Sequence, residues 1–472
     1  MDTKTHEGTR NIKRDKTVES SLPKILIANR GEIALRILRA CRELGLPSVV
    51  VFSEPDRESL AVKLADEAIC IGRGPASESY LKIERIIAAA ELSRSSAIHP
   101  GYGFLAENAH FAEVCAECNL IFIGPHARSI RTLGNKSAAR EAMLSAGVSV
   151  IPGSEGVLVD AQDALRWGEK LGYPVLLKAV SGGGGKGMRI VHERSEMLSS
   201  FNMASQEAER AFSDGSLYLE KFQVAPRHVE FQLMADRHGN VIHLGDRDCS
   251  LQRHHQKLLE ETPCTALTAE LRRQMGRTAI AAAKAVGYVG AGTVEFLLSQ
   301  SGEYYFMEMN TRLQVEHPVT EAVTGADLVC EQIRIALGDK LSWKQKDIKL
   351  QGHAIEIRIN AEDPKRNFSP CPGLVSNYLP PGGPGVRVDS HLYSGYVVPP
   401  YYDSMLAKII VHGADRKQAI ARSRSALREL RVEGVKTSAA FAEKLLEMPE
   451  FVSGEYHSAS VEQKLPELLA QL

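Results

Sequence analysis

The sequence predicts an α/β protein built from several domains, and three observations support this. The chain has 472 residues, too many for one ordinary core, so two to four domains are expected. Residues 24–53 alternate an apolar strand, an amphipathic helix and a second apolar strand. Residues 293–310 and 353–360 instead show the period of two that is typical of half-buried strands. We therefore expect a βαβ unit near the N-terminus, with hairpins and a mixed α/β region after it.

The composition argues against nucleic acid and membrane as partners. Hydrophobic residues make up 44% of the chain and the formal net charge is −1, so no basic nucleic-acid surface is expected. No apolar run approaches the ~20 residues that span a bilayer. The eight cysteines are scattered, which predicts reduced thiols in a cytoplasmic protein. Residues 1–22 are polar and lack the apolar segment of a signal peptide, so we expect a flexible extension.

Residues 23–134 are predicted to form a Rossmann-like domain. A first strand is followed by the turn NRGE and by a helix with apolar residues at helical spacing. Asp56 follows the second strand, where dinucleotide-binding proteins place a ribose-binding acid. The turn lacks the GxGxxG fingerprint, however, so the fold unit is expected without dinucleotide binding.

A glycine-containing loop, HPGYGFLAEN, occupies residues 99–108 and leads into a helix. Its glycines permit close backbone approach, and Tyr102 would project into any cleft that the loop borders. A purely structural turn is the alternative. The second domain is predicted to span residues 135–350, with Lys136 at its start.

Residues 151–223 are interpreted as a small inserted domain with a glycine-rich hairpin. Lys178 lies on the first strand, and Gly184 and Gly185 lie in the turn at residues 181–187. Successive amides in such a turn can wrap phosphate oxygens. The turn is not a Walker A loop, because a strand follows it rather than Ser or Thr and a helix. We expect a mobile lid over a nucleotide; a flexible hairpin without a ligand is the alternative.

Polar side chains recur along the next strands. In LYLEKF, Glu220 is expected to face inward on a segment whose backbone contacts adenine. The alternation of RHVEFQ places His228 on a polar face, where a satisfied sheet histidine is the alternative. The segment SLQRHHQK then supplies Gln252, His255 and Lys257. A basic loop beside a carboxylate-bound metal suits phosphoryl transfer, which depends on positioning and charge neutralisation.

The most informative stretch is the hairpin at residues 293–310 and the loop that leaves it. Glu308 and Asn310 share a strand face, and Glu295 lies on the partner strand; these are hard oxygen ligands suited to Mg²⁺. One functional side chain then follows at every second residue: Arg312, Gln314 and Glu316. An extended loop would place a guanidinium and a carboxylate beside the metal. A polar sheet face laced with ion pairs is the alternative.

The third domain is predicted at residues 351–472, after a helix at residues 319–338. In HAIEIRINAEDP the isoleucines face inward and Arg358 faces the opposite side. Spacing alone leaves Arg358 open between a functional guanidinium and a scaffold ion pair. A helix at about residues 415–430 completes this mixed α/β domain.

Ten segments together resemble biotin carboxylases, members of the ATP-grasp enzymes. They run from about Lys24 to the tail: ILIANRGEIALRILRA, AIHPGYGFLAEN, FIGP, KAVSGGGGKGMRIV, RHVEFQ, RDCSLQRHHQK, GAGTVEF, MEMNTRLQVEHPVTE, IEIRINAEDP and PPYYDSM. The resemblance implies a Rossmann-like N-terminal subdomain, a central ATP-grasp region with a glycine-rich lid, and a C-terminal domain that completes the cleft.

The resemblance also implies roles for individual residues. The residues implied to bind ATP are Lys136, Lys178, Gly184, Gly185, Glu220, Lys221, Phe222, Gln223, His228, Gln252, His255, Glu295 and Glu308. Those implied to hold Mg²⁺ or Mn²⁺ are Glu295, Glu308 and Asn310. Bicarbonate would be bound by Lys257, Arg312, Gln314 and the Val315 backbone. Biotin would contact Arg358 and Tyr102, and the catalytic residues would be Arg312, Glu316, Arg358 and Lys257.

The activity implied is the ATP-dependent carboxylation of biotin by a ligase. Glu316 would deprotonate bicarbonate, which attacks ATP to give carboxyphosphate, and Arg358 would stabilise the biotin anion. Biotin would arrive on a separate carrier protein, since no Ala-Met-Lys-Met-like stretch occurs here. Carboxyltransferase subunits and a homodimer are the other expected partners. The resemblance favours acetyl-CoA carboxylase and fatty acid biosynthesis, with pyruvate, 2-oxo acid or other acyl-CoA carboxylases as alternatives.

Competing functions fit the residues less well. Another ATP-grasp ligase would share the metal hairpin and the lid but would not need Arg312, Gln314 and Glu316 together with Arg358. A non-catalytic scaffold would be expected to have lost some of these charged residues. A nicotinamide-dependent oxidoreductase rests only on the first βαβ unit and fails at its turn.

Overall fold

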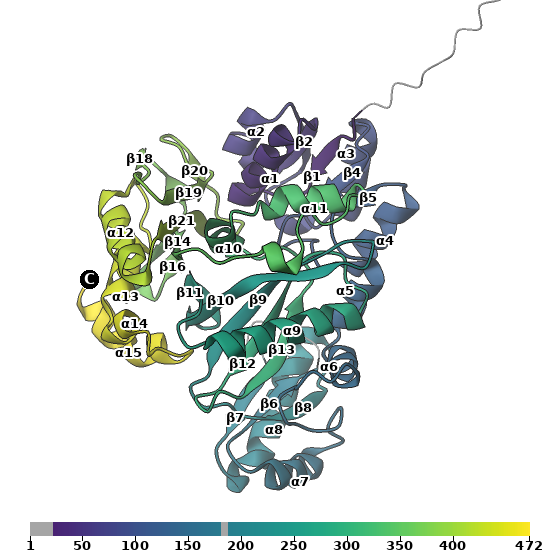
Figure 1. Cartoon of the computed structure of the whole chain (residues 1–472), viewed down its shortest axis with the longest axis vertical. Helices are drawn as coiled ribbons and strands as arrows, with labels where there is room; N and C mark the ends of the chain where they lie inside the picture. The colour runs from purple at the N-terminus through teal and green to yellow at the C-terminus, as the bar shows by residue number, and fades with distance from the viewer. Residues whose placement is uncertain (1–21, 181–186) are drawn as a thin grey trace, which may run out of the picture.

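The structure is a computed structural model that describes residues 22–180 and 187–472. The extension expected at residues 1–22 therefore lies outside the described residues except for Leu22, and so do Gly184 and Gly185. The α/β fold class is confirmed, with a parallel sheet near the N-terminus and a large antiparallel sheet after it (Figure 1). In the described part of the chain, no helix is long and apolar enough to span a bilayer.

The N-terminal region is a five-stranded parallel sheet in the order β3-β2-β1-β4-β5. Its strands are β1 (Ile25–Ile27), β2 (Ser48–Ser53), β3 (Glu67–Gly72), β4 (Ala97–His99) and β5 (Ile121–Phe122). The accompanying helices are α1 (Gly31–Glu43), α2 (Leu60–Leu64), α3 (Ile83–Leu92), α4 (Ala109–Glu117) and α5 (Ala127–Gly134). The apolar runs of β1 and β2 are buried, as both faces of this parallel sheet are covered.

The first turn of this sheet is closed by an ion pair. Arg30 Nε lies 2.7 Å from Asp56 Oδ2, and the Tyr80 hydroxyl donates to the same oxygen at 2.7 Å. The guanidinium also donates to Asp56 Oδ1 at 2.8 Å. Asp56 is buried and fully committed to these partners. The acid that could have bound a ribose therefore serves the fold.

The central sheet has eight strands in the order β13-β12-β9-β10-β11-β14-β21-β19, and all of its pairings are antiparallel. Its strands are β9 (Arg227–Ala235), β10 (Val241–Arg253), β11 (Gln256–Thr262), β12 (Gly290–Leu298), β13 (Tyr304–Asn310), β14 (His353–Asn360), β19 (Val386–Ser390) and β21 (Met405–Gly413). The sheet thus takes strands from both sides of residue 350, where a domain boundary was expected. Helix α9 (Ala269–Ala285) lies over one face of the sheet (Figure 1). Phe231 and Phe296 pack into the core on this face, and the other face carries the polar residues.

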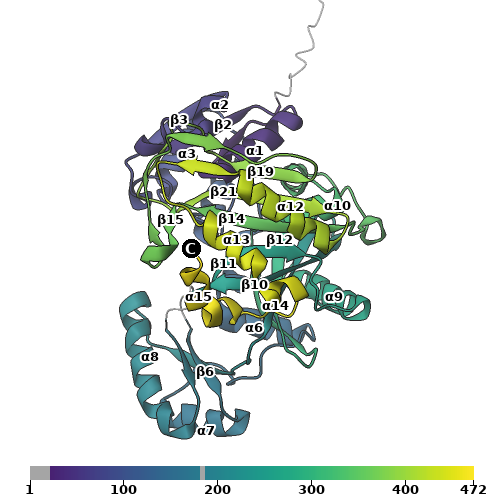
Figure 2. The ribbon, with the colours of Figure 1, turned by 90° about the vertical axis from the view of Figure 1, so that its left-hand side faces the viewer.

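The small inserted region projects from the rest of the molecule (Figure 2). Its sheet has the order β7-β6-β8, from β6 (Val175–Ala179), β7 (Met188–Val191) and β8 (Leu217–Lys221). Two helices, α7 (Ala161–Leu171) and α8 (Met197–Phe212), share a core with these strands. The helix α6 (Lys136–Ser145) precedes it, and a bridge between Gly153 and Glu220 ties the entering chain to β8.

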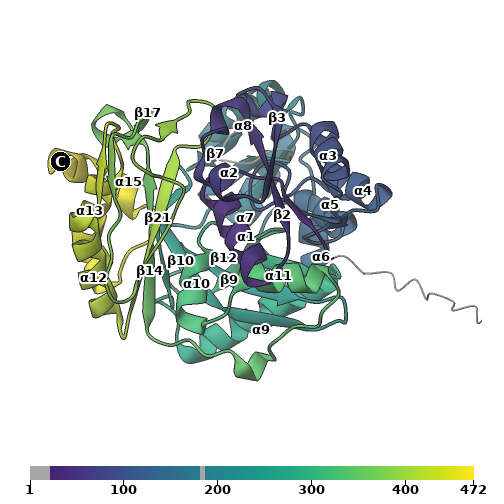
Figure 3. The same ribbon diagram turned by 90° about the horizontal axis from the view of Figure 1, so that it is seen from above.

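The helix expected at residues 319–338 is two helices, so that prediction was wrong. The structure has α10 (His317–Thr324) and α11 (Leu328–Ala336), with Gly325 between them at φ +73°. The left-handed conformation of Gly325 ends α10, and the Asp327 side chain caps α11. Helix α11 packs against α1 of the N-terminal region (Figure 3).

Four helices cover the outer face of the C-terminal strands. They are α12 (Arg416–Glu429), α13 (Ala439–Glu447), α14 (Pro449–Ser453) and α15 (Ser460–Ala470). Short strand pairs lie in the same region: β15 (Glu362–Asp363) with β16 (Ser369–Pro370), β17 (Gly373–Leu374) with β20 (Val397–Val398), and β18 (Asn377–Leu379) with β22 (Arg431–Glu433). The isoleucines of β14 lie in this core, as their alternation predicted.

Glu261 joins β11 to the C-terminal elements through three donors. His353 Nε2 lies 2.6 Å from it, Arg416 Nε 2.8 Å and the Tyr456 hydroxyl 2.6 Å. Burial opposes its charge, but the hydrogen bonds from His353 and Arg416 prevail and lower the pKa of Glu261 to about 2. The carboxylate therefore contributes stability above the unfolded-state pKa of about 4.5, and this contribution is lost as the pH falls towards 2.

We predict that Glu261→Gln lowers the free energy of unfolding by about 3–5 kcal/mol at pH 7, because it leaves the half-buried guanidinium of Arg416 without its carboxylate partner. The difference in melting temperature from wild type should shrink between pH 4.5 and pH 3, as wild type loses the same charge. Melting curves at pH 7, 5, 4 and 3 measure this. A difference that stays constant with pH would show that the charge of Glu261 is not the stabilising feature.

Candidate active site

The polar face of the central sheet borders a cleft of about 2110 Å³ that the small inserted region and the C-terminal strands also line. Apart from Gly184 and Gly185, which lie outside the described residues, every residue predicted for the site lines this cleft. They are Tyr102, Lys136, Lys178, Glu220, Lys221, Phe222, Gln223, His228, Gln252, His255, Lys257, Glu295, Glu308, Asn310, Arg312, Gln314, Val315, Glu316 and Arg358.

A row of charged residues crosses the polar face of the sheet. The strand register places Glu308 opposite Glu295, Glu295 opposite Glu230, and Glu230 opposite Arg247. Three carboxylates on adjoining strands repel one another, so the row depends on cations. Arg247, which is fully buried, donates to Glu230 at 2.5 Å and closes one end.

Lys257 is the common partner of three carboxylates. Its Nζ lies 2.7 Å from Glu230, 3.1 Å from Glu295 and 2.6 Å from Glu316. These acids come from β9, β12 and the start of α10, so one ammonium group ties together three separate segments of the chain. Such pairs offset the cost of removing charges from water only when the geometry is this close.

Glu316 is held between two cations. Lys257 contacts one carboxylate oxygen at 2.6 Å, and Arg358 contacts the other at 2.8 Å. Burial opposes the charge, but Lys257 and Arg358 prevail and keep the pKa of Glu316 well below its ordinary value. Arg358 also donates from Nε to Glu260 at 2.6 Å. The carboxylate is therefore ionised at neutral pH and aligned by its partners.

The loop after β13 brings its alternating residues together, although it is not extended throughout. Residues 315–316 form a turn that leads into α10. Asn310 and Gln314 both donate to Glu295 Oε1, at 2.8 and 2.9 Å. Arg312 donates to Gln314 Oε1 at 2.8 Å. Side chains predicted to point the same way thus converge through mutual hydrogen bonds.

Glu295 and Glu308 fit a divalent cation. Glu308 opens into the cleft and has no ion-pair partner within the described chain. Desolvation by the surrounding protein and the negative charge of Glu295 raise the pKa of Glu308. A divalent cation beside the two acids would relieve this repulsion, and Asn310 offers an amide oxygen on the same strand. Carboxylate and amide oxygens are the donor set that Mg²⁺ takes.

His228 has partners at both ring nitrogens. Gln252 Nε2 lies 2.8 Å from Nδ1, and Nε2 lies 2.7 Å from Glu295 Oε2. Burial opposes protonation, but the charge of Glu295 prevails and raises the pKa of His228. The imidazole therefore both braces Glu295 and faces the cleft.

A second basic group lies where the small inserted region meets the cleft. Lys178 on β6 lies 2.9 Å from Glu220 on β8. Lys136 begins α6, and burial and the ammonium of Lys178 lower its pKa. His255 lies in the turn between β10 and β11 with φ +64° and is exposed at the cleft. Tyr102 lines the cleft, but its hydroxyl donates to Glu32.

Sequence reasoning missed four charged residues of the site. Arg247 on β10 and Glu260 on β11 lie on the polar face of the sheet, which the alternation of their strands indicates. Glu107 pairs with Arg312 at 2.9 Å, although 205 positions separate them. Lys408 contacts the Val315 carbonyl from β21. For Glu107 and Lys408 no local pattern points to the site, because their partners are distant in the chain.

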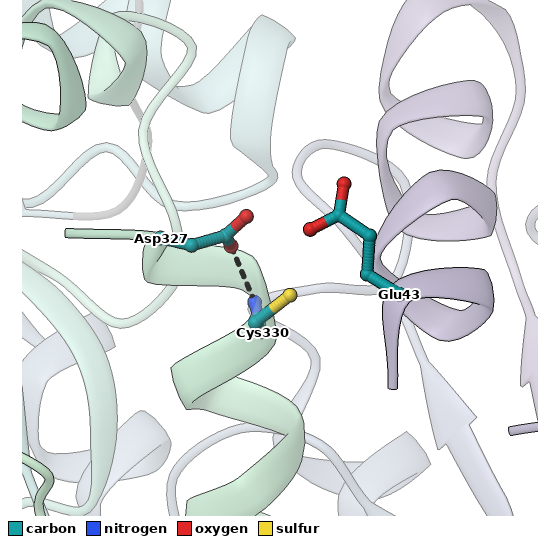
Figure 4. A group of neighbouring side chains, drawn as sticks. All are labelled: Glu43, Asp327 and Cys330. Atoms are coloured by element: carbon teal, nitrogen blue, oxygen red, sulfur yellow. Dashed lines mark hydrogen bonds between the residues drawn. The ribbon is translucent and has the colours of Figure 1, made fainter. Parts of the chain in front are cut away.

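A second group of potential ligands lies away from the cleft (Figure 4). Glu43, Asp327 and Cys330 place ligand atoms near one another where α1 meets α11. Asp327 is already committed: it caps α11 and lies 2.7 Å from Arg36. Burial raises the pKa of the Cys330 thiol to about 12. This group is therefore a helix cap and an ion pair within the fold.

The antiparallel sheet, the small three-stranded region and the carboxylates between them define an ATP-grasp enzyme. The family model "Carbamoyl-phosphate synthase L chain, ATP binding domain" matches residues 135–344. Two further models complete the chain: "Biotin carboxylase, N-terminal domain" at residues 21–130 and "Biotin carboxylase C-terminal domain" at residues 356–463. The chain belongs to the biotin carboxylase family, the ATP-dependent ligases that serve biotin-dependent carboxylases.

Individual relatives agree with this assignment. The biotin carboxylase of Nostoc sp. is 56% identical over 93% of this chain and 98% of its own. A pyruvate carboxylase subunit of Methanothermobacter thermautotrophicus is 52% identical over 93% of this chain and 89% of its own. The biotin carboxylase domain dimer of Hydrogenobacter thermophilus 2-oxoglutarate carboxylase, solved with MgADP, ADP and bicarbonate, matches with a TM-score of 0.91 at 47% identity. That match covers 95% of this chain and 99% of the other.

We predict that Arg247→Met destabilises the protein by about 3–5 kcal/mol, because it leaves Glu230 buried beside two other carboxylates. The double variant Arg247→Met/Glu230→Gln should recover part of this loss, since it removes the uncompensated charge. Melting temperatures of the wild type and of both variants at pH 7 measure the effect. A double variant less stable than Arg247→Met alone would contradict this electrostatic account.

Proposed function

We propose that this chain carboxylates biotin on a carrier protein, using ATP and bicarbonate, through carboxyphosphate. The observation that carries the proposal is the position of Glu316 between Lys257 and Arg358, 2.6 and 2.8 Å away. The proposed base, Glu316, thus lies directly against Arg358, the guanidinium proposed to stabilise an anion. The loop that leads to Glu316 also carries Arg312 and Gln314. Family membership and the bound ligands of the 2-oxoglutarate carboxylase domain support it.

ATP would bind between the central sheet and the small inserted region. The phosphates would meet the ammonium groups of Lys136 and Lys178 and the imidazole of His228, with Gln252 and His255 nearby and Gly184 and Gly185 in the predicted lid. Adenine would lie against the segment at residues 220–223. Glu295, Glu308 and Asn310 would hold Mg²⁺ or Mn²⁺, which supplies charge neutralisation to the phosphates.

Bicarbonate would bind to Lys257, Arg312, Gln314 and the Val315 amide. As long as Lys257 and Arg358 stabilise its carboxylate, Glu316 is a weak base. Bicarbonate would accept hydrogen bonds from Lys257 and so weaken that pairing, which raises the pKa of Glu316 as the substrate arrives. Glu316 then takes the proton, and the bicarbonate oxygen attacks the γ-phosphorus to give carboxyphosphate and ADP.

Carboxyphosphate would break down to CO₂ and phosphate within the cleft. Phosphate takes the proton from the biotin ureido nitrogen, and that nitrogen attacks CO₂. Arg358 stabilises the negative charge that develops on the ureido oxygen, because a fixed guanidinium stabilises an oxyanion without accepting a proton. Tyr102, on the loop that borders the cleft, is the second proposed biotin contact.

The proposal extends to partners and to the final acceptor. Biotin would arrive in trans on a biotin carboxyl carrier protein, and carboxyltransferase subunits would use the product. Acetyl-CoA is the preferred acceptor; pyruvate, a 2-oxo acid or another acyl-CoA is the alternative. Relatives named as pyruvate carboxylase and 2-oxoglutarate carboxylase, at 52% and 47% identity, keep the first two alternatives open. We also propose that the protein forms a homodimer. We further propose a cytoplasmic location, which the eight free thiols support.

The domain boundaries remain part of the proposal. We place them at residues 134/135 and 350/351, with residues 151–223 as the lid subdomain. The family models support this division, because their matches end at residue 130, resume at 135 and resume again at 356.

We predict that Glu308→Gln weakens Mn²⁺ binding in the presence of ADP on the order of 10- to 100-fold, because one of two carboxylate ligands is lost. Electron paramagnetic resonance titration of Mn²⁺ measures the affinity. Glu303→Gln is the matched control, since Glu303 is exposed at the turn of the same hairpin and does not line the cleft. Equal affinities for both variants would remove Glu308 from the metal site.

We predict that Arg358→Ala uncouples the two half-steps. Biotin carboxylation should fall on the order of 10²–10³-fold, while bicarbonate-dependent ATP cleavage falls less. Some loss of ATP cleavage is expected, because Arg358 also aligns Glu316. Glu316→Gln should depress both activities, since it removes the base that acts before carboxyphosphate forms.

Phosphate release and biotin-dependent ¹⁴C fixation, measured on the same preparations, test this prediction. Arg366→Ala is the control, because Arg366 is exposed in the same region and does not line the cleft. Melting curves establish that each variant is folded. Equal losses of both activities in folded Arg358→Ala would show that the arginine organises the site rather than stabilising the biotin anion.

A further inference from the structure

Two side chains outside the proposed bicarbonate contacts hold the backbone of the bicarbonate loop. The Gln314 carbonyl lies 2.8 Å from His317 Nδ1, and the Val315 carbonyl accepts a hydrogen bond from Lys408 Nζ at 2.8 Å. One donor comes from α10 and the other from β21 of the C-terminal region. Two consecutive peptide groups are thus fixed by their oxygens.

Fixing a carbonyl oxygen also fixes the next amide. In a planar trans peptide the C=O and N–H bonds point in opposite directions. The donor on the Gln314 carbonyl therefore sets the direction of the Val315 N–H, and the donor on the Val315 carbonyl sets that of the Glu316 N–H. Both residues line the cleft, and within the described chain neither amide has a hydrogen-bond partner. The two amides are left free for an anion.

Placing Lys408 at this position costs free energy, because its charged group is removed from water. Its side chain is fully buried, and the strand register puts it opposite Arg358, another cation. Glu32 lies 3.1 Å from its Nζ and compensates the charge. Burial opposes protonation, but Glu32 and Glu356 prevail and raise the pKa of Lys408, so that the group remains a donor. A buried ammonium of this kind needs a role that an apolar side chain would not fill.

His317 is held as a neutral donor. A carbonyl oxygen only accepts, so Nδ1 must carry the proton. The ring is fully buried, and burial and the positive charge of Lys408 keep the pKa of His317 well below its ordinary value. The Gln314 carbonyl therefore sets the tautomer of His317. Lys408 acts on both peptide groups: it binds the Val315 carbonyl directly, and its charge keeps His317 neutral.

We propose that Lys408 and His317 are positioning residues that aim the Val315 and Glu316 amides at bicarbonate. They do not touch the substrate themselves. The inference rests on the proposed function, and it adds two residues on which the affinity for bicarbonate depends. Losing Lys408 frees the Val315–Glu316 peptide to rotate. Losing the His317 ring leaves the Gln314 carbonyl only the longer hydrogen bond from the His317 backbone N–H, at 3.3 Å, so its peptide is held less firmly. Either loss weakens bicarbonate binding while the ATP contacts stay in place.

The test compares Michaelis constants in bicarbonate-dependent ATP cleavage. Lys408→Met and His317→Leu remove the donors, whereas His317→Asn keeps an N–H near the position of Nδ1. Each donor-removing variant should raise KM for bicarbonate on the order of tenfold, as expected for one aligned hydrogen bond, while KM for ATP changes by less than about twofold. His317→Asn should restore most of the affinity. Lys63→Met, which removes an exposed lysine outside the cleft, is the control.

The outcomes separate the two levels of the proposal. Wild-type protein without bicarbonate-dependent ATP cleavage overturns the proposed function, and this inference with it. Active wild type whose variants lower kcat alone, or raise both KM values together, overturns the positioning role and leaves the function intact. Where Lys408→Met does not fold, the comparison of His317→Leu with His317→Asn decides.

Discussion

The structure depends on the burial of like charges in one row of a β-sheet. Glu308, Glu295 and Glu230 lie opposite one another on three adjoining strands. Side by side they would repel, and the charges of Glu295 and Glu230, which are buried, are also costly to remove from water. Arg247 closes the row, and Lys257 lies beneath it. Glu308, at the far end, has no ion-pair partner among the residues that the structure describes, and a divalent cation there would complete the balance.

This balance explains why the cleft needs the whole chain. Lys257 reaches acids from three segments, Arg358 brings the C-terminal strands to Glu316, and Glu107 brings the N-terminal region to Arg312. Each contact is also a contact between parts of the fold. The groups proposed to carry out the chemistry are therefore among those that hold the regions together, and forming the site is part of folding.

Much of this was accessible from the sequence, for identifiable reasons. Alternation with a period of two placed His228, Glu295 and Arg358 on the correct strand faces, because one face of each of their strands is apolar. Alternation fails on the strand of Glu308, where a bulge shifts the register and Phe306 and Met309 both lie in the core. The sequence did not reveal that Gly325 divides a helix, since a glycine inside a periodic stretch is ambiguous until its φ is known. Glu107 and Lys408 were missed because their roles come from pairing between regions distant in the chain, which no local spacing encodes.

The eight-stranded sheet contains strands from both sides of residue 350, and this limits where the chain can be divided. β11 and β14 are paired from Leu259 to Thr262, and Glu260 on β11 takes its cation from Arg358 on β14. Cutting the chain between them would leave β11 as a bare edge, with open amide and carbonyl groups ready to pair with another molecule. It would also leave the buried carboxylate of Glu260 without its cationic partner. The C-terminal region is thus not a detachable module, and a fragment that ends before it should self-associate rather than fold.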